Sequence, residues 1–139
     1  MGLSLIAGVL AGCASYGAGR CVDYISLATP ADRFRAAELV VEAQLTKSDG
    51  TVADFSVYPE YRAEVLKVLK GAPTEGALRV ISTSDQCETQ GQPARYVNGD
   101  PLSSGGARVL YLVPAETEGV WRLVVPGATD PIAVADQLP

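Results

Sequence analysis

The stretch that decides the fold covers residues 38–47 and reads ELVVEAQLTK. In one phase of this stretch every second position is apolar, at Leu39, Val41, Ala43 and Leu45. Side chains of a β-strand point alternately to opposite faces, so a period of two indicates a strand with one buried face. We therefore predict a half-buried strand over residues 38–47.

A second strand is predicted over residues 61–69, and a start near Phe55 is the alternative. The alternation of apolar and polar residues in this strand changes phase part-way along it. The inward positions begin as Tyr61, Ala63 and Val65 and continue on the other phase as Leu66 and Val68. One extra residue near Val65-Leu66 accounts for this change. Such an insertion is a β-bulge, a common device for bending a strand around a barrel.

Further strands follow at residues 78–83, 108–113 and 120–125, and residues 132–134 are expected to add an edge strand. Turn signals lie between the strands, at Ser48-Asp49-Gly50, at residues 71–76, at residues 114–119 and in the long loop 85–106. One short helix is predicted at residues 30–37, because Thr29 suits the N-cap and Pro30 suits the first helical position.

These elements show no alternation of strands with helices, so a parallel α/β sheet is excluded. The predicted fold is all-β with minor α content. Five strands within about 90 residues suit a five-stranded Greek-key barrel of the OB type, with one or two short helices packed on it.

Composition narrows the classes of partner. The chain has 139 residues, a formal net charge of −5 and 47% hydrophobic residues, which is typical of a folded domain rather than a disordered chain. A net negative surface without a Lys/Arg cluster repels nucleic acid, so no nucleic-acid partner is expected. The sequence contains no histidine and no C-x-x-C pair. We expect no metal site and no cofactor.

The start of the chain resembles the signal of a bacterial lipoprotein. Uncharged, mostly apolar residues from Leu3 onward lead to Leu10-Ala11-Gly12-Cys13, which is similar to a lipobox. The resemblance implies that residues 1–12 are a removed signal peptide, that Cys13 carries the lipid and that residues 13–20 are a tether. No Lys or Arg precedes Arg20, so the usual positive n-region is missing. A buried N-terminal strand or helix is the alternative.

The three cysteines fit this interpretation. If Cys13 carries a lipid, Cys21 and Cys87 are left over, and an exported domain meets an oxidising compartment in which a disulfide persists. The alternative is that Cys21 and Cys87 are two unrelated buried thiols.

Three stretches resemble the netrin-like family, which includes the N-terminal domain of tissue inhibitors of metalloproteinases. They are residues 37–45, residues 61–71 with the run VLKVLKG, and residues 78–83 followed by Cys87. The resemblance covers residues 21–127 and implies an OB barrel over residues 21–139 with a Cys21–Cys87 bridge. Those inhibitors chelate a protease zinc through an N-terminal cysteine. Cys21 is internal, so zinc chelation of that kind is not expected.

Other candidate residues favour binding or structural roles. Asp85 with Glu88 and Glu116 with Glu118 are carboxylate pairs in loops and are interpreted as solvated or structural. A serine hydrolase triad lacks its histidine. Tyr96, Tyr111 and Trp121 are a possible binding surface for stacking against a ligand, although Trp121 is more typical of a core residue.

The sequence therefore predicts a non-catalytic binding domain, outside the cytoplasm and anchored by lipid to the membrane or envelope of a bacterial cell. A protein or peptide is the expected partner, together with the membrane itself. The alternatives are an inhibitor of an extracellular protease, acting through residues 48–60 or 114–119, and a hydrolase with an unrecognised site.

Overall fold

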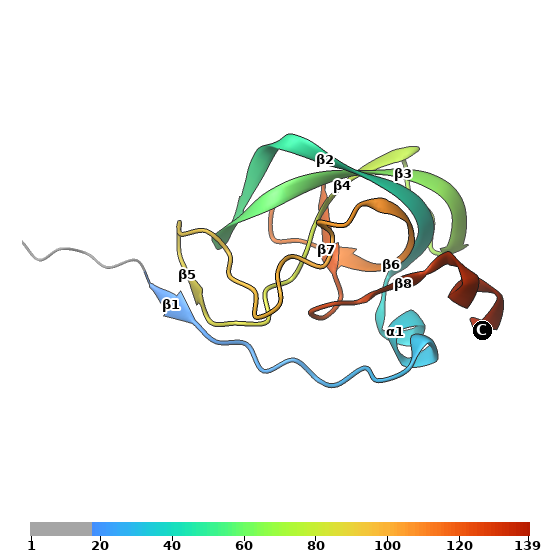
Figure 1. Cartoon of the computed structure of the whole chain (residues 1–139), viewed down its shortest axis with the longest axis horizontal. Helices are drawn as coiled ribbons and strands as arrows, with labels where there is room; N and C mark the ends of the chain where they lie inside the picture. Colours follow the sequence, from blue (N-terminus) through green and yellow to red (C-terminus); the bar gives the residue numbers. More distant parts are fainter. Residues whose placement is uncertain (1–17) are drawn as a thin grey trace, which may run out of the picture.

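Five strands close into a barrel in the computed structural model, which describes residues 18–139 (Figure 1). The barrel strands, in their order around it, are β2 (Leu39–Asp54), β3 (Ser56–Lys70), β4 (Ala77–Ile81), β7 (Val120–Leu123) and β6 (Gly106–Pro114). Pairing of β6 with β2 closes the barrel, β4 and β7 are parallel, and the other neighbours are antiparallel. The predicted five-stranded barrel of the OB type is confirmed.

The inward face of β2 carries the residues that the alternation predicted. Leu39, Val41, Ala43 and Leu45 are at most 3% exposed. Val40 lies on the opposite face of the strand, which was expected to be exposed, but it is also fully buried. Each of the valine and leucine side chains among them contributes about 1.5–3 kcal/mol when it leaves water. The barrel interior is therefore the main source of stability.

The predicted bulge in β3 is confirmed. Glu42 pairs with Lys67 and Ala43 pairs with Val65, which leaves Leu66 without a partner on β2. Leu66 is 59% exposed. The predicted change of phase is wrong, because Leu66 and Val68 were expected to point inward and Val68 is also exposed, at 41%. Beyond the bulge, Val65 and Leu69 are the side chains that pack against the core.

The turn predicted at Ser48-Asp49-Gly50 is wrong. β2 continues to Asp54, and residues 48–50 form the third irregularity in its pairing with β3, between the pairs Lys47–Tyr61 and Thr51–Pro59. The chain reverses only at Phe55, which has a φ of 66°. The longer hairpin is held by a second small core of buried side chains, namely Val52, Tyr58, Ile81 and Val120.

Two short helices flank the barrel. The predicted first helix is confirmed as α1 (Pro30–Ala36), and the Thr29 hydroxyl accepts a hydrogen bond of 3.1 Å from the Asp32 amide. The predicted edge strand at 132–134 is wrong, because the edge strand is β8 (Thr129–Pro131) and a 3₁₀ helix, η1 (Ile132–Gln137), follows it. Pro131 has no amide hydrogen with which to continue the strand pairing.

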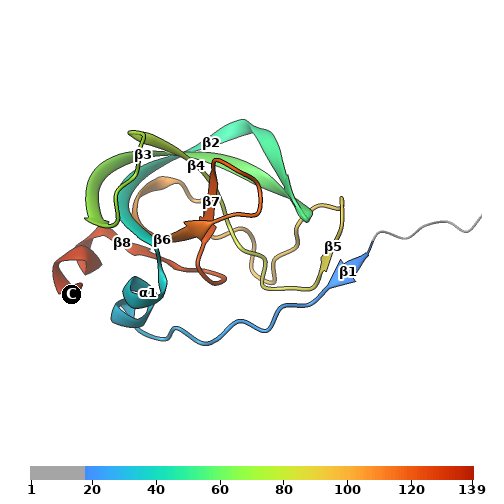
Figure 2. The same ribbon diagram turned by 180° about the vertical axis from the view of Figure 1, so that it is seen from behind.

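The N-terminal part of the described chain crosses the outside of the barrel. Strand β1 (Gly19–Arg20) pairs with β5 (Glu88–Thr89) in the long loop, and the predicted disulfide between Cys21 and Cys87 is present. From there the chain runs alongside the barrel to α1, as both views show (Figures 1 and 2). The folded part therefore includes Gly19 and Arg20, which were expected in the tether.

The predicted signal peptide and the lipidation site Cys13 lie outside the described residues. Among residues 18–139, no helix is both long and apolar enough to cross a membrane.

Ionisation of buried tyrosines gives the fold a pH dependence. Burial, together with the negative charge of Asp100 and a 3.1 Å hydrogen bond to its carboxylate, raises the pKa of Tyr61 from 10.0 to about 12. Because the folded value lies above the unfolded one, this stabilisation is complete below pH 10 and is lost as the pH rises through 12. We expect tyrosinate absorbance in a pH titration to show Tyr61 ionising only near pH 12.

The matched control is Tyr61→Phe, which should remove that late titration step and no other. The same chain in denaturant should ionise all its tyrosines near pH 10. Ionisation of Tyr61 near pH 10 while the near-ultraviolet circular dichroism stays native would contradict the prediction.

Candidate functional site

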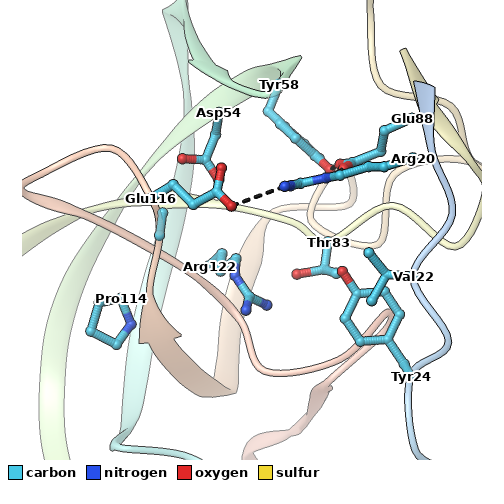
Figure 3. Close-up of a pocket in the computed structure, with 11 residues that line it drawn as sticks. Arg20, Val22, Tyr24, Asp54, Tyr58, Thr83, Glu88, Pro114, Glu116 and Arg122 are labelled. Carbon is cyan, nitrogen blue, oxygen red and sulfur yellow. Dashed lines mark hydrogen bonds and ion pairs between the residues drawn. The ribbon is translucent and has the colours of Figure 1, made fainter. Parts of the chain in front are cut away.

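A cavity of about 230 Å³ lies where the N-terminal segment meets the barrel (Figure 3). Four parts of the chain line it: the N-terminal segment, the β2–β3 hairpin, the region from β4 to β5, and the β6–β7 loop with β7. The lining residues are Arg20, Val22, Tyr24, Asp54, Tyr58, Thr83, Glu88, Pro114, Ala115, Glu116 and Arg122. Segments far apart in the sequence thus build one site.

Arg20, in the N-terminal segment, contacts each of the other three parts. Its Nε donates to Glu88 over 2.7 Å, and its Nη1 donates to Glu116 over 2.9 Å. Its guanidinium also lies 4.2 Å from the centre of the Phe55 ring at the hairpin tip. Burial opposes the charged form, but the hydrogen bonds and charges of the two glutamates outweigh it and raise the pKa of Arg20. Arg20 is therefore a fixed cation.

Glu88 is a structural carboxylate. It is 7% exposed, one oxygen accepts from Arg20 and the other accepts from the Tyr58 hydroxyl. Of the two roles expected for Glu88, solvated or structural, the structure shows the structural one, because the β1–β5 pairing and the disulfide place its loop against the barrel. Its sequence neighbour Asp85 is exposed and accepts a hydrogen bond of 3.0 Å from the Val97 amide.

Asp54 joins the hairpin to the β6–β7 loop. It is 4% exposed, and its Oδ1 accepts hydrogen bonds from the amide and the hydroxyl of Thr117, over 2.7 and 2.9 Å. Asp54 and Thr117 are 63 residues apart in the chain, so no local sequence pattern reveals this contact. Glu118, in the same loop, is exposed as predicted.

Arg122 occupies the middle of the cavity. Its backbone on β7 pairs with Val113 of β6 and Ile81 of β4, and its guanidinium points into the open space near Thr83 and Glu116 (Figure 3). Within residues 18–139 it makes no ion pair, and its one hydrogen bond is a 3.2 Å contact to the Leu123 carbonyl.

Tyr24 contributes a hydroxyl to the same cavity. Desolvation raises the pKa of Tyr24, and the positive charge of Arg122 partly opposes that rise. At neutral pH the phenol is therefore protonated and able to donate a hydrogen bond.

The aromatic surface predicted from Tyr96, Tyr111 and Trp121 does not form. Tyr111 is fully buried, with its hydroxyl donating to Asp130 over 2.8 Å, because both faces of its strand are covered. Trp121 packs against the barrel core, and the Tyr96 hydroxyl is bonded to Ser82. Tyr96 and Trp121 are partly buried in different clusters, so the three rings offer no common stacking face.

Next to the cavity, residues 22–28 form an exposed strip that we call the edge segment. They belong to no strand, and within the described part of the chain none of their backbone groups makes a backbone hydrogen bond. Within residues 18–139, the single hydrogen bond to their main chain is a 2.8 Å bond from the Arg33 side chain to the Leu27 carbonyl. The edge segment also carries Val22 and Ile25, which are 48% and 71% exposed.

Comparison of the chain with protein-family models, curated proteins and solved structures finds no match. The resemblance to netrin-like modules therefore stays a prediction that rests on the sequence stretches quoted above. In the described range, no group of three or more Cys, Asp or Glu residues is arranged to hold a metal ion.

Proposed function

We propose that this protein is a non-catalytic binding module for a protein or peptide partner, with the edge segment and the adjacent cavity as its contact surface. The observation that carries the proposal is the edge segment itself. Its backbone N–H and C=O groups lack backbone partners among residues 18–139, and it displays the apolar side chains of Val22 and Ile25. Unpaired backbone groups of this kind, as at the edge of a sheet, are a template for an added strand from another chain.

The edge segment is held at both ends. The disulfide at Cys21 and the β1–β5 pairing fix its start, while Arg33 and the helix α1 fix its end. A segment fixed in an extended conformation loses little further entropy when a partner strand adds to it. This preorganisation supports a binding role.

Photocrosslinking tests the contact surface. A photoreactive amino acid at Ile25 should yield a discrete crosslinked product in intact envelopes, and the substitution Val22→Asp in the same chain should abolish that product. Leu66 is the matched control position, because it is an apolar residue that is 59% exposed on β3. A product of equal yield from Leu66, or one insensitive to Val22→Asp, would contradict the proposed surface.

Inhibition of an extracellular protease is the second candidate. The two segments expected to act in this way are residues 48–60, now seen as the end of the β2–β3 hairpin, and residues 114–119. They meet at the cavity through the Asp54–Thr117 hydrogen bonds. Zinc chelation by a terminal amino group is not part of this proposal, since Gly19 and Arg20 precede Cys21 in the fold. Assays against metallo-, serine and cysteine proteases test it, and no inhibition in any class would reject it.

The membrane anchor is proposed to be a lipid on Cys13. An extended chain spans at most about 3.5 Å per residue, so Arg20 lies no more than about 25 Å along the chain from Cys13. A partner of the edge segment would accordingly be close to the membrane surface, on the extracytoplasmic side.

Loss of the lipid is expected to release the protein. The variant Cys13→Ser has no sulfur to acylate, and two acyl chains are what gives stable anchoring. We expect the wild-type chain in the membrane fraction and the variant in the soluble fraction after osmotic lysis. Cys87→Ser serves as the control, since it also replaces a cysteine by serine and breaks the bridge to Cys21, but it leaves Cys13 in place and should remain in the membrane fraction. Membrane association of Cys13→Ser would contradict lipidation.

A further inference from the structure

The charged residues of the cavity differ in how many of their donor or acceptor groups have a hydrogen-bond partner. Glu88 uses both carboxylate oxygens, and Glu116 is paired with Arg20. Asp54 accepts two hydrogen bonds from Thr117. Arg122 is the exception: of the five N–H donors of a guanidinium, one reaches an acceptor within residues 18–139.

From this difference we infer that the cavity binds a carboxylate group of the partner and that Arg122 is its principal ligand. The inference rests on the proposed binding function and names the chemistry that its cavity recognises. A guanidinium fits a carboxylate through two parallel hydrogen bonds, a geometry that lysine does not offer. The Tyr24 hydroxyl lies in the same cavity and supplies a further donor.

The size of the cavity limits what can carry this carboxylate. A volume of about 230 Å³ is below the roughly 300–1,000 Å³ typical of sites for whole small molecules. It suits one acidic side chain or the C-terminal residue of a peptide. Val22 and Tyr24 are two positions apart in the extended edge segment and both line the cavity, as residues on one face of a strand do. A peptide lying along the edge segment is therefore next to the cavity.

Charge balance is the main objection to an anionic ligand. The lining holds Asp54, Glu88 and Glu116 against two arginines, so a cation is the opposite possibility. However, each of these carboxylates already has a donor within the protein, and a cation would compete with Arg20 or Thr117 for it. Arg122 offers unused donors without such competition.

Peptide titrations of the full chain in detergent micelles test the inference. The probes are acetyl-Val-Glu-Val-amide, the same peptide with Gln, the same peptide with Lys, and acetyl-Val-Val with a free carboxylate. The side-chain Nε–H resonance of Arg122 is followed by NMR. We expect at least one carboxylate peptide to shift this resonance and to bind about 10-fold more tightly than the Gln peptide.

Two variants assign the effect. Arg122→Gln should remove the preference for the carboxylate peptide over the Gln peptide. Arg122→Lys should keep only part of that preference. Arg62→Gln is the control, because Arg62 is an exposed arginine on β3 and the change in net charge is the same. Binding of the free-carboxylate peptide alone identifies a chain terminus, and binding of the Glu peptide alone identifies an acidic side chain. Either result supports the inference.

Equal binding of the Glu and Gln peptides, tighter binding of the Lys peptide, or no binding of any probe would overturn the inference. The proposed function is judged separately by the Ile25 crosslink. If the crosslink persists in Arg122→Gln and no carboxylate preference exists, the edge segment stands as the contact surface and the carboxylate pocket is rejected. If the crosslink is also absent, both are rejected.

Discussion

Replacing Cys21 and Cys87 together by serine is expected to lower the free energy of unfolding by about 4 kcal/mol. The bridge spans 66 positions, so its loss frees a long loop in the unfolded chain. Both cysteines are exposed, and the two serine hydroxyls can be hydrated without leaving a cavity. Equilibrium denaturation in urea of the oxidised parent and of the double variant measures the difference.

Reduction of the parent provides an independent comparison. The dithiol form should unfold at the same urea concentration as the double variant, because both lack only the bridge. A change smaller than about 1 kcal/mol would show that the unfolded state is not constrained by the bridge as the loop-entropy model requires. The Ile25 crosslink should also weaken in the double variant, since the start of the edge segment then depends on Arg20 and the β1–β5 pairing alone.

Local patterns in the sequence were sufficient to predict the barrel. The period of two predicted β2, and the irregular apolar pattern near Val65-Leu66 predicted the position of the bulge, although Leu66 and Val68 point outward rather than inward. The hairpin was misplaced because Ser48-Asp49-Gly50 is typical of turns, whereas its actual position depends on contacts distant in sequence. Val52 and Tyr58 pack against Ile81 and Val120, and this packing favours the longer hairpin.

The cavity was not predictable in the same way. Arg20 is 68 residues from Glu88 and 96 residues from Glu116, so only the folded chain brings the three together. The disulfide could be predicted, because counting cysteines needs no geometry. The prediction that Tyr111 lies on a binding surface was wrong for a related reason. The residues next to an aromatic side chain in the sequence do not show whether another part of the fold covers that side chain.

The substitution Arg20→Met is expected to lower the free energy of unfolding by about 2 kcal/mol. It leaves Glu88 buried with the Tyr58 hydroxyl as its remaining partner. Removing one member of a buried ion pair costs roughly 3–5 kcal/mol, but Arg20 is more accessible than that case assumes and water offsets part of the loss. Methionine keeps an apolar stem against Phe55 and so separates the loss of charge from the loss of packing.

A double-mutant cycle with Glu88→Gln isolates the coupling between the two side chains. If loss of the Arg20–Glu88 ion pair is what destabilises Arg20→Met, the variant with both substitutions should lose less stability than the sum of the losses in the two single variants. Arg35→Met is the matched control, since its pair with Asp32 lies in solvent, at 69% and 43% exposure, and should contribute less than about 0.5 kcal/mol. Equal losses for Arg20→Met and Arg35→Met would mean that the Arg20 pairs do not hold the N-terminal segment on the barrel. The disulfide would then be the main tie that keeps Val22 and Tyr24 at the cavity.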